Sequence, residues 1–298
     1  MVSGGDLEPH VKPVEPNVNV TESIRHNTPI ILISLEPRGK IRIQRTKQKL
    51  ECASQRLFAQ EITMKKTLLA LLLASSLALA AGTLQDAQLQ YKNGDFTGAV
   101  QTAVALNTSD GFALAAKSNS IFASTQMNSK QEAIYMQSEK YARSAIGLDA
   151  NNSDGYFEIA RALGRLSQLR GILAALAQGL GGQIKDNLDK AIRLDPQYAN
   201  ALVALGLWHA EIVGQGVAFL YGADPTKGLA AFNRAIKLEP KAIIHHVEFA
   251  RGLMLIDAGK NKGEAIAQLE IAVTLTPRDA AEKLDLERAK RDLAALKK

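Results

Sequence analysis

A short phrase of apolar residues recurs four times in the chain, and this repeat limits the fold more than any other feature of the sequence. The copies are Ala145–Asp149, Ala191–Pro196, Ala235–Pro240 and Ala272–Pro277. Their starting points lie 46, 44 and 37 residues apart, a spacing typical of arrays of helical hairpins. Apolar residues three or four positions apart pack on one side of a helix, and a following proline stops it. The repeat therefore predicts that each phrase ends a helix.

A partner helix is expected before each phrase, and residues Tyr198–His209 supply one. This helix and the next phrase resemble the two helices of the tetratricopeptide repeat. The matching positions of the first helix are Leu202, Leu205, Gly206 and His209. Those of the second helix are Gly228, Phe232, Ala235 and Pro240. The glycine lets the two helices approach closely, and the large residues fill the space around it.

The fold class that follows is all-α, an α-solenoid of tetratricopeptide-like helical hairpins with a C-terminal capping helix. The predicted hairpins are about 84–107, 110–149, 153–195, 198–239 and 243–276. Residues 279–298 are the predicted cap, whose apolar stripe is Leu286, Ala289, Leu293 and Leu296. Charged residues cover its other faces, and we expect them to be solvated.

Two hairpins are longer than the usual 34-residue repeat, and the additional residues are apolar. They fall between the two helices of each hairpin, in Leu169–Gly182 and Val213–Pro225. With this pattern, and with the phrase Leu205–His209, the stretch Asn151–Lys298 resembles the regulator of microtubule dynamics family. The resemblance implies an adaptor-like α-helical fold. We do not carry over a microtubule role, because the features described next indicate a secreted bacterial protein.

Residues 64–80 have the three parts of a secretory signal peptide in order. Lys65 and Lys66 precede 15 apolar or small residues, and Ala78 and Ala80 satisfy the A-x-A cleavage rule. Cleavage is predicted between Ala80 and Ala81. A membrane anchor is the alternative, but the apolar stretch is shorter than the about 20 residues that span a bilayer. The mature chain is therefore expected in the periplasm or outside a bacterial cell, without a membrane span.

Residues 1–63 precede this signal peptide, although signal peptides begin a chain. The segment contains prolines and shows no apolar periodicity, so we expect it to be disordered. Translation is predicted to start at Met64, which makes residues 1–63 an upstream extension outside the natural protein. The alternative is a real cytoplasmic extension that converts the apolar segment into an uncleaved anchor.

Composition excludes several functions for residues 81–298. The chain's single cysteine, Cys52, lies before them, so thiol catalysis and cysteine metal sites are excluded. The net charge falls from +6 for the whole chain to +2, which removes the electrostatic support for nucleic-acid binding. The three histidines, His209, His245 and His246, do not have metal-ligand spacing, and His209 occupies an aromatic packing position. We find no catalytic motif and predict no enzyme activity, metal or cofactor.

The concave face of a solenoid is the first place to expect a binding site. The groove-facing positions of the repeat fall on Asp110, Lys117, Asp154, Phe157, Arg161, Arg165, Asn200, Val203, Glu211, Val247, Arg251 and Met254. One register places Lys117, Arg161 and Arg251 in three hairpins. These cations suit the carboxylates of an acidic or C-terminal peptide. The alternative is that they are solvated charges, paired with Asp154 or Glu158.

The apolar inserts predict a second surface. A hydrophobic rim for lipid, a partner helix or self-association would consist of Leu173, Leu176, Phe219, Leu220 and Tyr221. The alternative is that these residues pack against one another, because a lengthened hairpin needs its own core.

The function predicted from the sequence is an exported, non-catalytic scaffold that binds a protein of the cell envelope through its groove. A periplasmic lipid or small-molecule carrier, or a transport accessory protein using the apolar inserts, is the alternative. The oligomeric state stays open, because solenoid ends and apolar rims can self-associate.

Overall fold

Each copy of the repeated phrase lies at the end of a helix, and its alanine is completely buried. Ala145, Ala191, Ala235 and Ala272 each have 0% of their surface exposed. They belong to α5 (Asn128–Leu148), α8 (Leu180–Leu194), α11 (Pro225–Leu238) and α12 (Ile243–Thr274). A proline follows two or three residues after α8, α11 and α12, where it cannot continue the backbone hydrogen bonding.

The computed structural model describes residues 33–35, 41–43, 59–66, 82–126 and 128–298. It divides into two compact units, Met1–Leu73 and Ala74–Lys298. In the first unit β1 (Ile33–Leu35) pairs antiparallel with β2 (Ile41–Ile43), and residues 59–66 are helical. The two strands and residues 59–63 fall in the segment for which the sequence predicts disorder, and residues 64–66 fall at the start of the predicted signal peptide. Most of the predicted signal peptide, including Ala80 and Ala81, lies outside the described residues.

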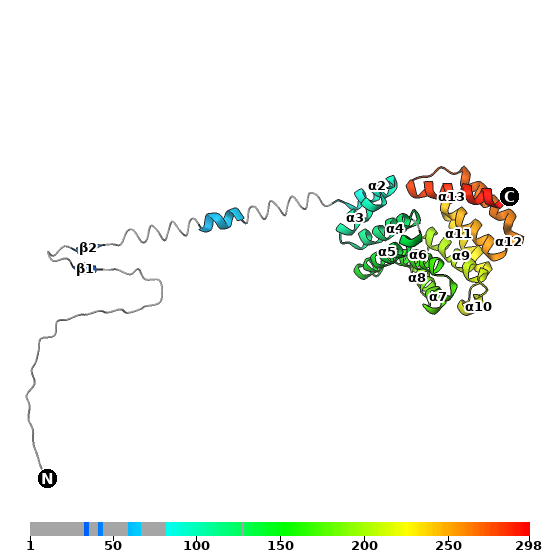
Figure 1. Ribbon diagram of the computed structural model, residues 1–298, viewed down its shortest axis with the longest axis horizontal. Helices are drawn as coiled ribbons and strands as arrows, with labels where there is room; N and C mark the ends of the chain where they lie inside the picture. The colour runs from blue at the N-terminus through cyan, green and yellow to red at the C-terminus, as the bar shows by residue number, and fades with distance from the viewer. Residues whose placement is uncertain (1–32, 36–40, 44–58, 67–81, 127) are drawn as a thin grey trace, which may run out of the picture. The chain divides into compact units, whose positions relative to one another are not determined.

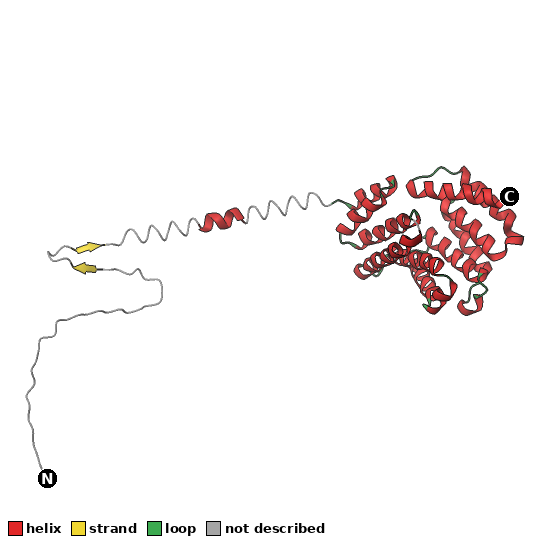
Figure 2. Cartoon of the chain, viewed as in Figure 1, coloured by secondary structure: helices red, strands yellow, loops and turns green. Residues whose placement is uncertain are grey.

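In its described residues the second unit is built of helices (Figures 1 and 2). Besides those already given, they are α2 (Leu84–Asn93), α3 (Phe96–Ala105), α4 (Ser109–Ser124), α6 (Ser153–Arg170), α7 (Ile172–Ala177), α9 (Ala199–Gly214), α10 (Ala218–Tyr221) and α13 (Ala280–Leu296). Hairpin partners pack as α2 with α3, α4 with α5, α6 with α8 and α9 with α11. The two apolar inserts contain the short helices α7 and α10. Among the described residues, no helix combines the length and the apolar character needed to cross a membrane.

A fifth hairpin is contained within α12. The backbone of Asp257 is extended there, with φ −163° and ψ 96°, so the helix folds into two arms. Phe249 and Leu253 of the first arm lie in one apolar cluster with Leu269 of the second arm. The side-chain amide of Asn261 donates to the Leu253 carbonyl at 3.1 Å and ties the arms together beside the bend.

Close contact among α9, α11 and α12 depends on two glycines that face the same phenylalanine. Phe232 of α11 has 0% exposed surface and stacks on Phe249, with ring centroids 4.9 Å apart. A Cβ atom on Gly206 of α9 would lie 2.8 Å from this ring, and one on Gly252 of α12 would lie 2.6 Å from it. Both positions therefore need glycine for the helices to reach this distance.

The last helix of the solenoid returns to the first. The apolar stripe of α13, which includes Leu286 and Leu293, packs on the cluster of α12. The start of α13 also contacts α2, where Ala281 lies in one cluster with Tyr91 and Phe96. Figure 1 shows α13 in red beside α2 in cyan. The five hairpins and the cap thus close into a ring, whereas the cap was expected only to cover one end.

Candidate functional site

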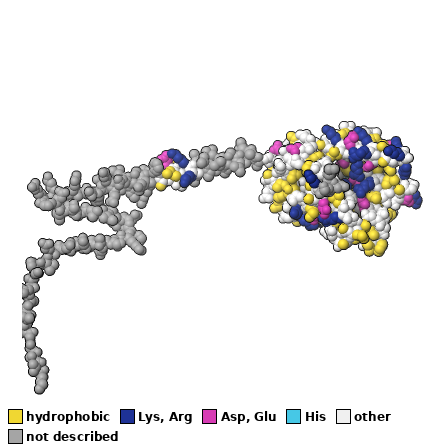
Figure 3. All heavy atoms as spheres, viewed as in Figure 1, with side chains coloured by type: hydrophobic (Ala, Val, Ile, Leu, Met, Phe, Trp, Pro, Cys, Tyr) yellow, Lys and Arg dark blue, Asp and Glu magenta, His cyan; other side chains and the backbone are white. Residues whose placement is uncertain are grey.

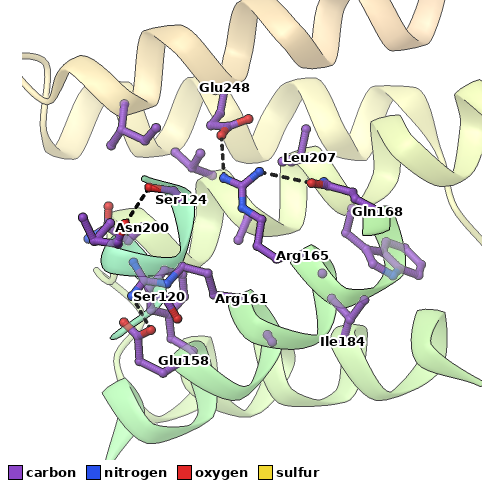
Figure 4. A pocket seen from close by; sticks show the side chains of 18 of the residues that line it. Ser120, Ser124, Glu158, Arg161, Arg165, Gln168, Ile184, Asn200, Leu207 and Glu248 are labelled. Carbon is purple, nitrogen blue, oxygen red and sulfur yellow. Dashed lines mark hydrogen bonds and ion pairs between the residues drawn. The ribbon is translucent and has the colours of Figure 1, made fainter. Parts of the chain in front are cut away.

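The ring of helices surrounds a cavity of about 570 Å³. Side chains of α2, α4, α6, α8, α9, α12 and α13 form most of its wall, and α7 and α10 add a few residues. The volume lies within the range of ordinary ligand-binding pockets, about 300–1,000 Å³. The lining divides into a polar end, a central group of charges and an apolar end, which Figure 4 shows in part.

The polar end is formed by α4 and α6, with Tyr91 of α2. The ammonium group of Lys117 lies over the ring of Tyr91, 4.8 Å from its centroid. Arg161 pairs with Glu158 at 2.5 Å and donates to the backbone carbonyl of Lys117 at 3.0 Å. Ser120 is only 4% exposed, and within the described part of the chain neither its hydroxyl nor the Nε of Arg161 has a hydrogen-bond partner. This end therefore offers unused donors to an acceptor group.

Burial controls the charge of Glu158 at this end. Its side chain is 2% exposed, and loss of hydration raises the pKa of its carboxyl from 4.5 to about 7. The neighbouring cations Arg161 and Lys117 act in the opposite direction and limit the rise. Near neutral pH the carboxyl can therefore exist with or without its proton.

Glu248 of α12 is the centre of the charged group. Its carboxyl is surrounded by Arg288 at 2.8 Å, Arg165 at 3.4 Å and Arg251 at 3.6 Å. Burial alone would raise the pKa of Glu248, but the three guanidinium groups lower it to about 2. Figure 4 shows Arg165 reaching from α6 toward Glu248, with Gln168 on its other side at 3.1 Å.

The polar face of α13 contributes to the same group. Arg288 crosses from α13 to Glu248, so the cap is held to α12 by an ion pair as well as by apolar packing. Asp285 lies one turn earlier, where burial and the charge of Glu248 raise the pKa of its carboxyl to about 7. Asp285, Glu287, Arg288 and Arg291 line the cavity. The expectation that the polar faces of the cap are solvated therefore does not hold for Asp285 and Arg288, whereas Glu287 and Arg291 are exposed.

The apolar end is shaped by the inserts of the two long hairpins. Trp208 of α9 is 4% exposed, and its indole N–H donates to the Gly181 carbonyl at 2.8 Å. The ring of Tyr221 meets Trp208 edge-on, with centroids 6.4 Å apart. Leu176 and Ile184 complete this end of the lining. A ligand would meet bulky apolar groups here and hydrogen-bond donors at the opposite end.

The structure brings together most of the residues predicted to face the groove. Those that line the cavity are Lys117, Phe157, Arg161, Arg165, Asn200, Val203 and Glu211. The remaining five, Asp110, Asp154, Val247, Arg251 and Met254, do not line it. Asp154 instead accepts a hydrogen bond from the Tyr198 hydroxyl, and Met254 packs against the apolar cluster of α12.

The three cations predicted to bind a peptide carboxylate already contact other side chains of the same molecule. Arg161 pairs with Glu158, as the alternative interpretation of the sequence has it, and Arg251 pairs with Glu211 and Glu248. The described structure gives Lys117 its contact with Tyr91 and no carboxylate within 4 Å. Of the three cations, Lys117 is therefore the one whose charge is most available to a ligand.

Several cavity residues escaped the sequence analysis. Ser120 and Glu248 are not among the groove-facing positions predicted from the repeat, and the contribution of α13 depends on ring closure. A signal did exist for Glu248, because a lone carboxylate in the otherwise uncharged run Ile243–Ala250 indicates a buried and paired group.

The predicted apolar rim separates into two groups. Leu176 and Tyr221 turn into the cavity wall. Leu173 and Phe219 are each 81% exposed, and Leu220 is 56% exposed. The second group is therefore not used to pack the inserts together.

The histidines are part of the packing of the helices. His209 is 4% exposed, and its Nδ1 accepts the backbone N–H of Asp224 at 3.0 Å. His245 contacts the side-chain oxygen of Asn200 at 3.0 Å, and His246 contacts that of Gln268 at 2.7 Å. Over the described residues, no group of three or more His, Cys, Asp or Glu side chains is placed to hold a metal ion.

Successive helical hairpins that enclose a cavity define the class of protein as a tetratricopeptide-like solenoid. A solved structure, that of a thermophilic TPR protein of Thermus thermophilus, superimposes on the chain with a TM-score of 0.50. The two chains are 18% identical, and the match covers 70% of this chain and 97% of the other. The predicted fold class is thereby confirmed. A fold of this class supports protein interaction and is typically non-catalytic.

The family is shown by sequence. The sequence model of the family "Regulator of microtubule dynamics protein 1-3" matches residues 111–297, which is more than half of the chain. The chain therefore belongs to this family, and the predicted resemblance is confirmed. No curated protein matches it.

Proposed function

We propose that this chain is an exported, non-catalytic scaffold that binds a segment of an envelope protein in the cavity of its helical ring. The proposal rests on one observation. The cavity has hydrogen-bond donors without partners in the described structure at one end and bulky apolar side chains at the other. Ser120, the Arg161 Nε and Lys117 suit a carboxylate of an acidic or C-terminal peptide. The apolar end suits a large side chain of the same segment.

The sharpest test of cavity binding is a variant whose added side chain fills the cavity. A glycine within a cavity-lining helix is a suitable position for it. Gly164 of α6 lines the cavity, and a Cβ atom there would meet nothing within 4 Å. Gly164→Leu therefore places its side chain in the binding space, and its Cβ atom meets no neighbouring group. Gly147 of α5 also has open space around it but does not line the cavity, so Gly147→Leu is the matched control.

The experiment is crosslinking of C-terminally tagged protein in living cells, followed by mass spectrometry of the periplasmic fraction. We expect one abundant envelope protein with the wild type and with Gly147→Leu, and its loss with Gly164→Leu. Equal capture by both variants would remove the cavity from the proposal. Charge reversal of Arg161 or Arg251 is a poorer test, because each would then repel the glutamate that it now pairs with.

Export has a separate measurement. Intact mass of the protein purified from the same cells is expected to place its N-terminus at Ala81. A peptide that begins at Met1 would contradict both the export and the proposed start at Met64.

A carrier of a lipid or small molecule is the second candidate, and the apolar end of the cavity favours it. Leu176, Ile184 and Trp208 offer a surface that an apolar ligand can bury. Native mass spectrometry separates the two functions. A bound molecule that is present in the wild type and in Gly147→Leu, and absent from Gly164→Leu, would place the carrier first.

A further inference from the structure

The turns inside four successive hairpins lie side by side along one edge of the solenoid. We call this the turn edge and define it as residues 130–132, 170–179, 214–224 and 255–263. Arg170 at the end of α6 pairs with Glu132 near the start of α5 at 2.8 Å. Gln168 of α6 donates to Glu211 of α9 at 3.2 Å, which brings the ends of these two helices together. A Cβ atom on Gly214 would lie 2.7 Å from the Leu255 carbonyl, so the last turn borders the third.

The middle of the turn edge exposes large apolar side chains. Leu173 of α7 and Phe219 of α10 are each 81% exposed, and Leu220 is 56% exposed. Figure 3 shows hydrophobic side chains gathered at the lower tip of the second unit, where Figure 1 places α10 close to α7. These side chains protrude from the ends of short helices and do not line a groove, and the cavity is lined by other residues of the inserts. Such protrusion suits a soft surface better than a rigid complementary one.

Lysines occupy both outer parts of the turn edge. Lys130 lies on one side and Lys260 and Lys262 on the other, all three exposed and, in the described structure, without a carboxylate within 4 Å. Three acidic side chains also lie on the turn edge, and one of them is ion-paired. Glu132 pairs with Arg170, and the oxygens of Asp224 and Asp257 accept backbone N–H groups at 2.7 and 3.0 Å. Hydrogen bonds from backbone N–H groups leave a carboxylate its charge, so the turn edge carries four basic and three acidic side chains, a net charge of +1. The three lysines are its cations without a carboxylate partner in the described structure.

We propose that the turn edge docks onto the surface of an anionic lipid bilayer. Leu173, Phe219 and Leu220 enter the boundary between head groups and acyl chains, and Lys130, Lys260 and Lys262 lie among the anionic head groups. Exposed apolar groups beside unpaired lysines are the combination that binds proteins peripherally to anionic membranes. None of these six side chains lines the cavity, so the proposal goes beyond the scaffold function and does not depend on it.

A tryptophan in place of Phe219, at the exposed end of α10 that we call the tip, directly reports insertion of this side chain into the bilayer. In the full chain carrying Phe219→Trp, emission is measured with vesicles of phosphatidylglycerol and phosphatidylcholine that contain brominated acyl chains. The native Trp208 is 4% exposed in the core, so the wild-type chain supplies the background signal. Leu89→Trp is the matched control, because Leu89 of α2 is 56% exposed and lies outside the turn edge. Attachment of the chain to vesicles through residues before Gly82 would not change the emission of a tryptophan at position 219, because this emission depends on the surroundings of that side chain.

We expect a blue shift and bromine quenching for Phe219→Trp and neither for Leu89→Trp. Replacing Lys130, Lys260 and Lys262 by Gln should weaken the binding measured at the tip about fivefold for each lysine. Unchanged emission of Phe219→Trp on these vesicles would overturn the proposal, as would equal quenching of the two reporters. A blue shift that grows with protein concentration in the absence of vesicles would also overturn it, and would assign the tip to contact between copies of the chain.

Discussion

Glu158 and Glu248 are two buried glutamates of one cavity whose environments shift their pKa values in opposite directions. Burial dominates at Glu158 and raises its pKa to about 7, although Arg161 and Lys117 are near. At Glu248 three arginines outweigh burial and lower the pKa to about 2. Removing one partner of a buried ion pair typically costs about 3–5 kcal/mol, so Glu248 mainly holds α6, α12 and α13 together. Of the two glutamates, Glu158 is the one whose charge changes near neutral pH.

This difference predicts the pH dependence of stability. The pKa of Glu158 in the folded chain is higher than the ordinary value of 4.5, so the folded state holds the proton more tightly. Its contribution to stability is fully present below about pH 4.5 and is lost as the pH rises through about 7. Glu158→Gln should therefore flatten the decline between about pH 5 and 7.5 by about 1–3 kcal/mol, measured as the free energy of unfolding in urea.

Two comparisons complete this test. Asp285, with its pKa raised to about 7, adds a decline of the same sign, so Glu158→Gln is expected to remove only part of the slope. Glu264→Gln changes an exposed glutamate and should keep the wild-type profile. If Glu158→Gln retained the full wild-type decline, its carboxyl would not be the group that titrates. Below about pH 4.5 the loss of the Glu248 ion pairs should lower stability again, because its pKa lies below the ordinary value.

At the scale of elements, two glycines of similar sequence context have opposite roles. Gly206 and Gly164 both lie inside helices, where alanine has the higher helix propensity by about 0.8–1.0 kcal/mol. A Cβ atom on Gly206 would press on the buried ring of Phe232, whereas one on Gly164 would meet open space. The propensity gain is therefore available only at Gly164.

We expect Gly206→Ala to lower the free energy of unfolding by about 1–3 kcal/mol, because the ring of Phe232 is fixed between α9 and α12. Gly164→Ala should raise it by about 0.5–1 kcal/mol. Urea denaturation of both variants beside the wild type measures the difference. Equal effects at the two positions would mean that the close approach at Phe232 does not limit the packing.

The helices show which parts of the fold can be predicted from one sequence. The repeated phrase marks helix ends because its alanine is always buried and its proline cannot continue the helix, and both properties are local. The bend of α12 also has a local marker, because Gly259, Asn261 and Gly263 follow Asp257 and are poor helix formers. The return of α13 to α2 has no local marker. The site divides in the same way. Groove positions such as Arg161 follow from repeat register, whereas the pairing of Arg165, Arg251 and Arg288 with Glu248 requires the three-dimensional curvature of the solenoid.

At the scale of the whole molecule, ring closure changes how stability is distributed. In an open solenoid each repeat contacts only its neighbours, so a change in the last helix affects the hairpin beside it. Here Ala281 of α13 packs with Tyr91 and Phe96 of the first hairpin, and Ala280 lies against Gly94 in the turn between α2 and α3. The first and last elements therefore support each other directly.

Ala281→Glu tests this coupling, because Ala281 is 7% exposed and a glutamate there would be buried without a partner. Hydrogen exchange followed by mass spectrometry should show faster exchange in α2 and α3 as well as in α13, with α8 and α11 unchanged. Ala295→Glu in the same helix is the control, since Ala295 is exposed and should leave all these segments at wild-type rates. Faster exchange confined to α12 and α13 would describe an open solenoid. Faster exchange in the first hairpin would instead show that a change near one end of the chain acts on the other end through the closed ring. We expect the free energy of local opening of that hairpin to fall by about 1–3 kcal/mol.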